Sequence, residues 1–411
     1  MNITYFKAIN WLLLIPVALA VGCTAPAKTS FRTDLPKTWT LESDPEIGAE
    51  SVFLTQDSQN QPVAVWTEKA QDSEQIQVLY SRWDGHKFTN PQRIPMEENP
   101  KVHSESIPKL LFKPNGELLL FYEVKIPDPT NDRVSHVKYQ VSRDEGKTWS
   151  APYRVHSDNS PGKGHSFFDV TLLPDGEIGA VWLDTSLVEG GRSLLFSKTS
   201  SNNQFGKESV VDSLACQCCR TALYADSSGL ISVVYRDILP GSIRDISLAT
   251  SRDGGITFSN SISFSFDQWN LEGCPHNGPD VVSDGKKIYT TWYTGASQNG
   301  VYFAELDTQG KTLRKEKMSP NGRNIQLSLM NGKPVVVYSE SVTENGKKGS
   351  RILRMDMSTG EKTQLSSPGS KVSNPISLAT GSGMLLTAWL DHSGEIQKVR
   401  VHVSPPSLTL R

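Results

Sequence analysis

The sequence lacks an excess of charge of either sign. Its 42 Lys and Arg and 44 Asp and Glu leave a formal net charge of −2, and no stripe of basic residues stands out. A nucleic-acid partner is therefore not predicted. The apolar run near the N-terminus, Trp11–Val21, is only about half of the ~20 residues that a membrane-spanning helix needs. Cysteine is scarce, with five in 411 residues, yet three of the five fall within Cys216–Cys219.

The N-terminal segment has the pattern of a secretory signal, with an early lysine, a short apolar run and a small residue, Gly22, before Cys23. This boundary resembles that of bacterial lipoproteins, in which the cysteine is diacylated and becomes the mature N-terminus. We predict a lipoprotein signal peptide over residues 1–22, lipidation of Cys23 and a polar, lipid-anchored tether over residues 23–37. Thr24 after the cysteine implies, by the same resemblance, the outer membrane. Secretion with ordinary cleavage is the alternative.

A sequence pattern of an apolar stretch, a turn and a second apolar stretch occurs seven times along the remaining chain. Each copy closes on an aromatic residue, and these aromatics are Trp66, Tyr122, Trp182, Tyr235, Trp292, Tyr338 and Trp389. Four copies carry Asn-Gly or Asp-Gly at the turn, which supplies the positive φ that a two-residue hairpin needs. Each copy is therefore predicted to form a β-hairpin.

Two hairpins are followed by the same turn sequence, S-x-D-x-G-x-T-aromatic, at Ser142–Trp149 and Ser251–Phe258. The short polar side chains hydrogen-bond their own turn, and glycine takes the left-handed position. This is the Asp box, and it resembles the repeat of bacterial sialidases and related propellers. The box is structural, so it indicates a fold and not an activity.

Four strands in each unit of about 50 residues are typical of a β-propeller. We predict an all-β fold, a single Asp-box propeller over residues 38–411 with seven four-stranded blades. The familiar sialidases have six blades, so six is the alternative. Either Thr38–Ser43 or Leu408–Arg411 is expected to close the ring as the outermost strand of the last blade.

One face of such a propeller gathers the starts of the innermost strands and the loops between second and third strands, and function usually lies there. Alignment of the copies places four residues near the channel mouth: Ser166, Cys219, His276 and Arg323. The loops that return to the same face add Glu123, Asp184, Arg192, Arg236, Asp237, Arg244, Asp245, Tyr293 and Asp391. These are the candidate site residues.

The cysteines beyond Cys23 allow three interpretations. In an oxidising compartment they pair as disulfides that tie the fourth and fifth blades together, although four cysteines allow three complete pairings. Alternatively, thiolates and imidazole hold copper or zinc. That metal set is Cys216, Cys218, Cys219, Cys274 and His276, with His165 as a further ligand. A redox-active pair is the third interpretation.

A sharper resemblance lies in residues 213–280. The motifs are C-x-C-C-R-T from Cys216, Y-R-D from Tyr235, R-D-I from Arg244 and G-C-P-H-N-G-P from Gly273. Together they are similar to a group of bacterial sialidase-like Asp-box proteins generally described as exo-α-sialidases. The resemblance covers most of the mature chain for the fold and only this region for the detailed motifs.

That resemblance implies a retaining glycosidase in which arginines clamp the substrate carboxylate and a tyrosine is the nucleophile. The substrate-binding candidates are Arg220, Arg236, Arg244, Arg323, His165 and His276. Tyr293 is the candidate nucleophile, and Asp184 or Asp237 is the candidate acid/base. The Arg-Ile-Pro at Arg93 is expected on an outer strand, away from the axis.

We therefore expect a monomeric lipoprotein of the cell envelope, anchored in the outer membrane, that binds or hydrolyses an acidic glycan as an exo-α-sialidase-type enzyme. The alternative is a non-hydrolytic propeller that holds a soft metal or a protein partner through its Cys/His cluster. No cofactor is certain, and copper or zinc is the candidate.

Overall fold

The computed structural model describes residues 1, 31–32, 37–129, 131, 134–185, 187–344 and 346–404. Every regular element in these ranges is a β-strand, and none is a helix that could cross a membrane. The predicted signal peptide, Cys23 and nearly all of the tether lie outside the described residues, so lipidation stays a prediction.

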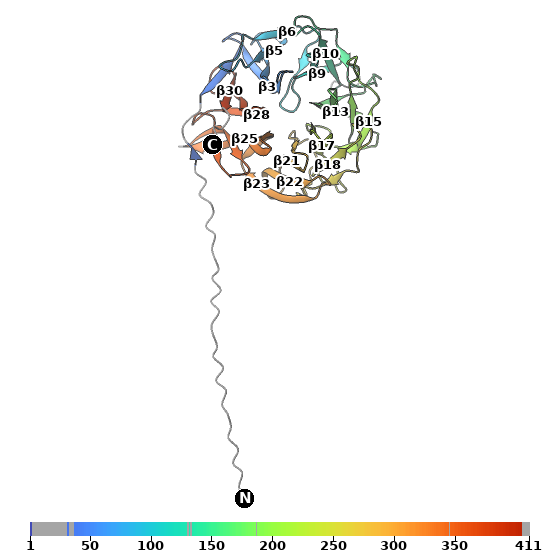
Figure 1. The fold of residues 1–411 in the computed structure, drawn as a ribbon, viewed down its shortest axis with the longest axis vertical. Coiled ribbons are helices and arrows are strands. Elements are labelled where there is room, and N and C mark those ends of the chain that lie inside the picture. Colours follow the sequence, from blue (N-terminus) through green and yellow to red (C-terminus); the bar gives the residue numbers. More distant parts are fainter. Residues whose placement is uncertain are drawn as a thin grey trace.

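Seven sheets form a ring, each with one strand at the centre and one at the rim (Figure 1). The prediction of seven blades is confirmed, and the alternative of six is wrong. Blade 1 contains β3 (Gly48–Gln56), β4 (Pro62–Lys69), β5 (Ile76–Arg82) and β6 (Gln92–Ile94). Blade 2 contains β7 (Pro100–Lys101), β8 (Lys109–Phe112), β9 (Leu118–Lys125), β10 (Ser135–Ser142) and β11 (Tyr153–Arg154).

The next three blades follow in chain order. Blade 3 contains β12 (Ser166–Leu172), β13 (Ile178–Thr185), β14 (Arg192–Lys198) and β15 (Ser209–Ala215). Blade 4 contains β16 (Ala222–Ala225), β17 (Ile231–Arg236), β18 (Ile246–Ser251) and β19 (Ile262–Ser263). Blade 5 contains β20 (Asp280–Ser283), β21 (Lys287–Thr294), β22 (Gly300–Asp307) and β23 (Thr312–Ser319).

The last two blades join the ends of the chain. Blade 6 contains β24 (Gly322–Met330), β25 (Lys333–Glu344), β26 (Lys347–Asp356) and β27 (Lys362–Gln364), with β1 (Phe31–Arg32) parallel to β27. Blade 7 contains β28 (Val372–Ala379), β29 (Leu385–Asp391), β30 (Lys398–Ser404) and β2 (Thr38–Leu41). Because β2 pairs with β30, the N-terminal of the two predicted segments closes the ring; Leu408–Arg411 lies outside the described residues.

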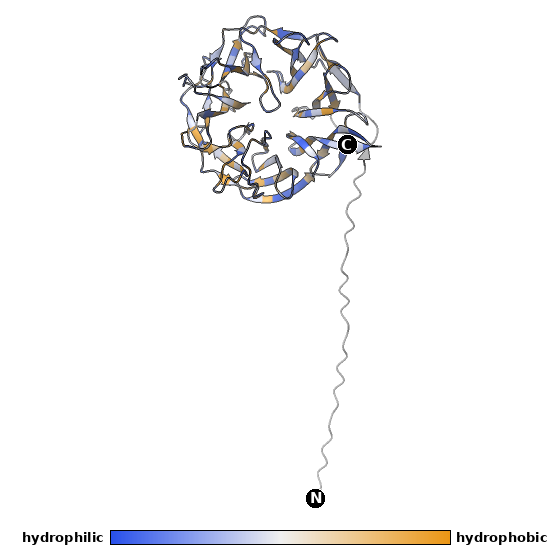
Figure 2. Cartoon of the chain, turned by 180° about the vertical axis from the view of Figure 1, so that it is seen from behind, coloured by the Kyte–Doolittle hydropathy of each residue, from blue (hydrophilic) through white to orange (hydrophobic). Residues whose placement is uncertain are grey.

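The hydrophobic core lies between neighbouring blades. The second strand of each blade is covered on both faces, which explains why it reads as a continuous apolar run; seven consecutive residues of β13 are buried. Phe121 of blade 2 packs in one cluster with Phe168 and Trp182 of blade 3. All seven closing aromatics of the hairpins are at most 2% exposed, and apolar residues occur all around the ring (Figure 2).

Both Asp boxes form the predicted turns between the third and fourth strands. In the first, Asp144 accepts hydrogen bonds from the Thr148 backbone N–H (2.8 Å) and hydroxyl (2.6 Å). The Ser142 hydroxyl oxygen accepts from the Gly146 N–H at 2.9 Å. Gly146 has φ +89°, a conformation that favours glycine. We call the face that carries the Asp-box turns the lower face. The connections between blades lie on the opposite, upper face, where the innermost strands begin.

Candidate functional site

Three segments meet on the upper face of blade 4. Residues 216–221 join β15 to β16, residues 237–245 join β17 to β18, and residues 264–279 join β19 to β20. The Cys216 N–H donates to the Arg236 carbonyl at 2.9 Å, and the Arg244 N–H donates to the Trp269 carbonyl at 2.8 Å. The motifs singled out from the sequence are thereby brought together.

Arg236 is buried where these segments cross, with 1% of its surface exposed. Its guanidinium donates to the carbonyls of Arg244 (2.6 Å), Asn277 (2.9 Å) and Tyr293 (2.7 Å). It also lies over the Trp269 ring, 4.8 Å from the centroid. Arg236 thus braces blade 4 against the connection to blade 5, and its donors face the protein backbone.

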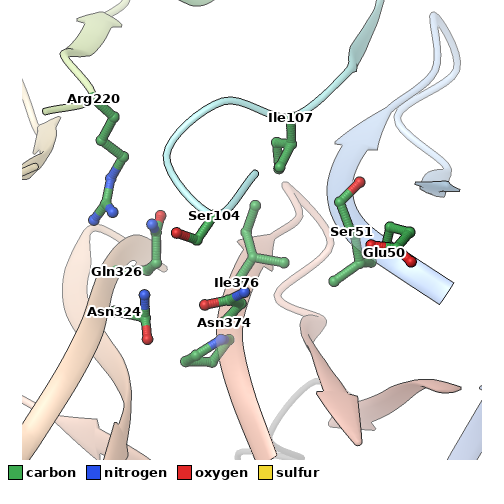
Figure 3. A pocket seen from close by; sticks show the side chains of 11 residues that line it. Glu50, Ser51, Ser104, Ile107, Arg220, Asn324, Gln326, Asn374 and Ile376 are labelled. Atoms are coloured by element: carbon green, nitrogen blue, oxygen red, sulfur yellow. The ribbon is translucent and has the colours of Figure 1, made fainter. Parts of the chain in front are cut away.

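Arg220 is held in a similar way by a loop of blade 2, two blades away around the ring. It donates to Glu105 at 3.0 Å and to the Ile325 carbonyl at 3.1 Å, and Glu105 also accepts the Gly278 N–H at 2.7 Å. The loop that carries Glu105 lies between β7 and β8 and reaches across the axis beside Arg220 and Gln326 (Figure 3). Through these contacts Glu105 holds the loop of residues 102–108 in the mouth of the channel. We call this loop the plug.

The remaining predicted arginines lie nearer the surface. Arg323 stacks on the ring of Tyr293, 4.2 Å from its centroid, and Tyr293 contacts Trp269 edge to face. Arg244 donates through Nε to the Leu271 carbonyl at 3.3 Å. The structure thus brings Tyr293 and Arg323 together.

The two candidate acid/base residues, Asp184 and Asp237, lie at the ends of second strands. Each accepts a hydrogen bond from a side chain of its own blade. Asp184 accepts from the Trp182 indole at 2.7 Å, and Glu68 accepts from the Trp66 indole at 2.8 Å in the same relative position. Asp237 accepts from the Ser247 hydroxyl at 2.7 Å. Burial raises the pKa of Asp184 and raises that of Asp237 to about 6.

Below the plug, the axis of the ring is a cavity of about 400 Å³ lined by all seven innermost strands. Lys109 and Asp169 form an ion pair there at 2.7 Å. Asp280 accepts the Leu327 N–H at 2.6 Å, which links blade 5 to blade 6, and burial raises its pKa to about 6. The polar groups of the channel are therefore largely engaged in joining blades.

The thiol cluster consists of Cys216, Cys218, Cys219, Cys274 and His276. The donor atoms of Cys216, Cys218 and Cys219 all lie within 4.8 Å of one another, and so do those of Cys218, Cys274 and His276. The four cysteines are free in this structure, and the Cys216 and Cys219 sulfurs are 3.9 Å apart. A bond between them would need about 2.05 Å, so disulfide pairing stays a prediction.

The electrostatics of the cluster favour one thiolate. Hydrogen bonds from the Cys218 and Cys219 thiols, with the nearby charge of Arg236, hold the pKa of Cys216 well below its usual range. Hydrogen bonding to Cys216 raises the pKa of Cys218, and burial raises that of Cys219. A negative sulfur is thereby placed near a buried guanidinium.

His165 lies outside this cluster. Its ring stacks on that of His156, with centroids 3.4 Å apart and planes within 4° of parallel, and His136 packs edge-on against both. The Nε2 of His165 is 3.4 Å from a carboxylate oxygen of Asp184. Two separate groups of residues that could hold a metal ion therefore occur in this part of the protein.

A family model described as a BNR repeat-like domain matches residues 55–271, more than half of the chain. The chain belongs to the BNR repeat-like family. No protein with a curated description matches its sequence. Thus the family assignment agrees with the Asp boxes and with the seven blades of this BNR propeller.

Solved structures similar to the BNR propeller include a protein of unknown function from Dyadobacter fermentans. Its TM-score is 0.53 at 13% identity, over 89% of this chain and 97% of that one. The intramolecular trans-sialidase of Ruminococcus gnavus, solved with oseltamivir carboxylate, has a TM-score of 0.48 at 10% identity, over 86% and 94% of the two chains. A Penicillium chrysogenum α-L-arabinanase, solved with arabinobiose, has a TM-score of 0.47 at 13% identity, over 90% of this chain and 97% of that one. At 13% identity, the likeness to the Dyadobacter fermentans protein shows the fold alone.

The plug of the BNR propeller gives a first testable prediction. Glu105→Gln should lower the free energy of unfolding by about 2 kcal/mol, because charge-assisted hydrogen bonds to Arg220 and Gly278 are lost. Urea unfolding measures the change, with the exposed Glu97→Gln as the control. Equal stability of both variants would show that the carboxylate does not hold the loop.

Proposed function

We propose that this BNR propeller binds a thiophilic metal ion, Cu(I) or Zn(II), in the thiol cluster on its upper face. The observation that carries the proposal is the convergence of four sulfurs and one imidazole from two separate connections, with Cys218 common to both groups of three. Thiolate and imidazole donors are the ligands that copper and zinc prefer in proteins.

The surroundings of the cluster support a bound cation with several thiolates. Cys216, Cys218 and Cys219 are 2–5% exposed, whereas Cys274 and His276 are exposed. An ion can thus enter from the solvent side and be held by the buried sulfurs. Arg236 makes its hydrogen bonds to carbonyl oxygens, and a cluster with net negative charge would balance its buried positive charge.

The same contacts weigh against a clamp for a substrate carboxylate, which needs guanidinium donors directed into a cleft. Arg220 binds Glu105 and backbone carbonyls, and Arg236 is enclosed. We therefore favour metal binding over hydrolysis of an acidic glycan. The predicted lipid anchor at Cys23 belongs to this proposal and would place the site in the cell envelope.

The test measures metal on the detergent-solubilised full chain after reduction and removal of metals. Wild type is expected to retain about one Cu(I) or Zn(II) per thiol cluster against a chromophoric chelator, with a thiolate–Cu(I) charge-transfer band for copper. Cys218→Ser should abolish this binding, because it removes the donor common to both groups. Gln217→Ala, an exposed residue between two of the ligands, should bind as wild type does.

Two results would overturn the proposal. One is equal metal retention by wild type and Cys218→Ser. The other is an isolated protein whose four cysteines alkylate only after reduction and which, once reduced and still folded by circular dichroism, binds neither ion. The second result would assign the cysteines to disulfides between blades 4 and 5.

A further inference from the structure

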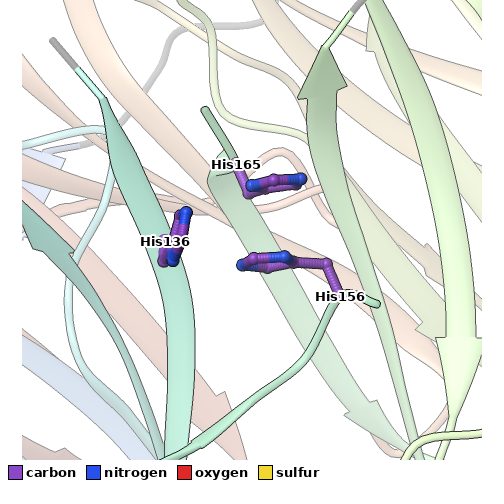
Figure 4. Close-up of side chains that lie close together, drawn as sticks. All are labelled: His136, His156 and His165. Carbon is purple, nitrogen blue, oxygen red and sulfur yellow. The ribbon is translucent and has the colours of Figure 1, made fainter. Parts of the chain in front are cut away.

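The histidine cluster, His136, His156 and His165, is formed by one strand and the two ends of one loop. His136 lies on β10. The Val155 N–H donates to the Val137 carbonyl at 3.0 Å, and the His165 N–H donates to the Ser135 carbonyl at 2.7 Å. The segment between them therefore leaves β10 and returns to it on either side of His136 (Figure 4).

The three rings meet in the interior. One ring nitrogen of each lies within 4.8 Å of those of the other two. His165 is 0% exposed, His156 3% and His136 8%. Both ring nitrogens of His165 and the Nε2 of His156 are buried without a hydrogen-bond partner. Unpaired buried polar atoms cost free energy, so this arrangement needs an explanation beyond packing.

The neighbours of His156 and His165 indicate which ring nitrogen carries the lone pair. The Nδ1 of His156 is 2.7 Å from the Asp158 carbonyl oxygen, which can only accept, so Nδ1 carries the proton and Nε2 is free to bind an ion. The Nε2 of His165 lies 3.4 Å from a carboxylate oxygen of Asp184 but makes no hydrogen bond to it in this structure. The nearby acceptor favours a proton on Nε2, which leaves the lone pair of Nδ1 for an ion. A backbone carbonyl or carboxylate behind the imidazole is the usual second contact of a metal-binding histidine.

We propose that His136, His156 and His165 form a second metal site, for a divalent ion that prefers imidazole, such as Zn(II), Cu(II) or Ni(II). Three histidines are a known ligand set for zinc, and imidazole suits copper and nickel as well. The site differs in donor type from the thiol cluster, so the protein has one soft site and one borderline site on neighbouring parts of its upper face.

Protonation supports this assignment, since metal ions bind the neutral imidazole. Burial lowers the pKa of His156 to about 3 and of His165 to about 2, and it also lowers that of His136. Charged groups of both signs lie near His165: the carboxylates of Asp158 and Asp184 and the guanidinium of Arg192. Arg192 donates to backbone carbonyls, including those of Gly164 and Leu183.

Ion binding has a structural consequence. Imidazole binds a metal in the plane of its ring, and the rings of His156 and His165 are now parallel at 3.4 Å. An ion shared by both must therefore open the stack by rotating at least one ring. The ¹⁵N shifts of these imidazoles should change on addition of Zn(II).

The experiment uses the full chain carrying Cys218→Ser, so that the thiol cluster does not contribute. With Zn(II) as the probe, this protein is expected to bind one ion and to gain thermal stability. Adding the substitution His156→Gln should weaken zinc binding by more than about 100-fold. Loss of an outer-shell partner weakens binding by about 10–100-fold, and loss of a ligand itself should cost more. Asp184→Asn should fall within that 10–100-fold range. His86→Gln, at an exposed position, is the control.

A spectroscopic measurement keeps the proposal testable if His156→Gln does not fold. The electron paramagnetic resonance spectrum of the Cys218→Ser protein with one Cu(II) should show coupling to several imidazole nitrogens. A folded protein that shows no such coupling, or equal zinc binding with and without His156, would overturn the proposal. Such a result would not bear on the proposed metal site in the thiol cluster. That site is tested separately, by the difference in metal retention between wild type and Cys218→Ser.

Discussion

Arg236→Ala is expected to lower the free energy of unfolding by about 3–5 kcal/mol, because each buried carbonyl left without its donor costs about 1–3 kcal/mol. Three backbone carbonyls, of Arg244, Asn277 and Tyr293, would each lose a charged donor at 2.6–2.9 Å. The contact with Trp269 adds a cation–π contribution of about 0.5–2 kcal/mol. The loss is large against the 5–15 kcal/mol that separates most folded domains from the unfolded state.

This prediction separates a brace from a substrate clamp. The measurement is urea unfolding of Arg236→Ala beside Arg252→Ala, an exposed arginine in the Asp box of the same blade. The control should change stability by less than about 0.5 kcal/mol, as surface substitutions usually do. A stable Arg236→Ala protein that had lost binding of a sialylated glycan would contradict the structural role and restore the clamp.

The fold was predictable because its determinants are local and repeated. Each hairpin, its turn and its closing aromatic lie within about 20 residues, and every blade repeats this pattern. The choice of closing strand was open, because the sequences of the two candidate segments do not differ in strand character. The pairing of Thr38–Leu41 with β30 decides it through contacts between residues about 360 positions apart.

The candidate site was only partly predictable. The motif-rich segments around Cys216 and Cys274 were expected to meet, and they do. Glu105 was missed because its partner Arg220 is 115 residues away and no local pattern marks an acid that crosses a ring. Arg236 lies on the expected face but is enclosed, since sequence does not reveal whether a guanidinium faces a cleft or a carbonyl.

The histidines show a different limit. From the sequence, His165 is predicted as a substrate-binding residue or as a further ligand of the thiol cluster. The structure turns it toward His136 and His156 instead, because the loop between residues 156 and 165 closes on β10. The only sequence signal was three histidines within thirty residues, without the short spacing of a helical or ribbon-type metal motif.

The histidine cluster also predicts a large effect of pH on the free energy of unfolding. In the metal-free protein, the pKa of His156 is lowered to about 3 and that of His165 to about 2 by burial, against about 6.5 in an unfolded chain. Between these values the unfolded state binds more protons, so the stabilising contribution of the neutral rings is full above pH 6.5 and is lost as the pH falls. Two such groups change the free energy of unfolding by about 2.7 kcal/mol per pH unit.

The measurement compares wild type with the double variant His156→Asn/His165→Asn, by urea unfolding in a chelator from pH 8 to pH 5. The two carboxyls whose pKa is raised to about 6, Asp237 and Asp280, act in the opposite direction. Both proteins contain them, so the difference between the two curves isolates the histidines. We expect wild type to lose about 4 kcal/mol more than the variant between pH 8 and pH 5. Parallel curves would contradict this prediction, because they would mean that the rings bind protons in the folded protein as readily as in the unfolded chain.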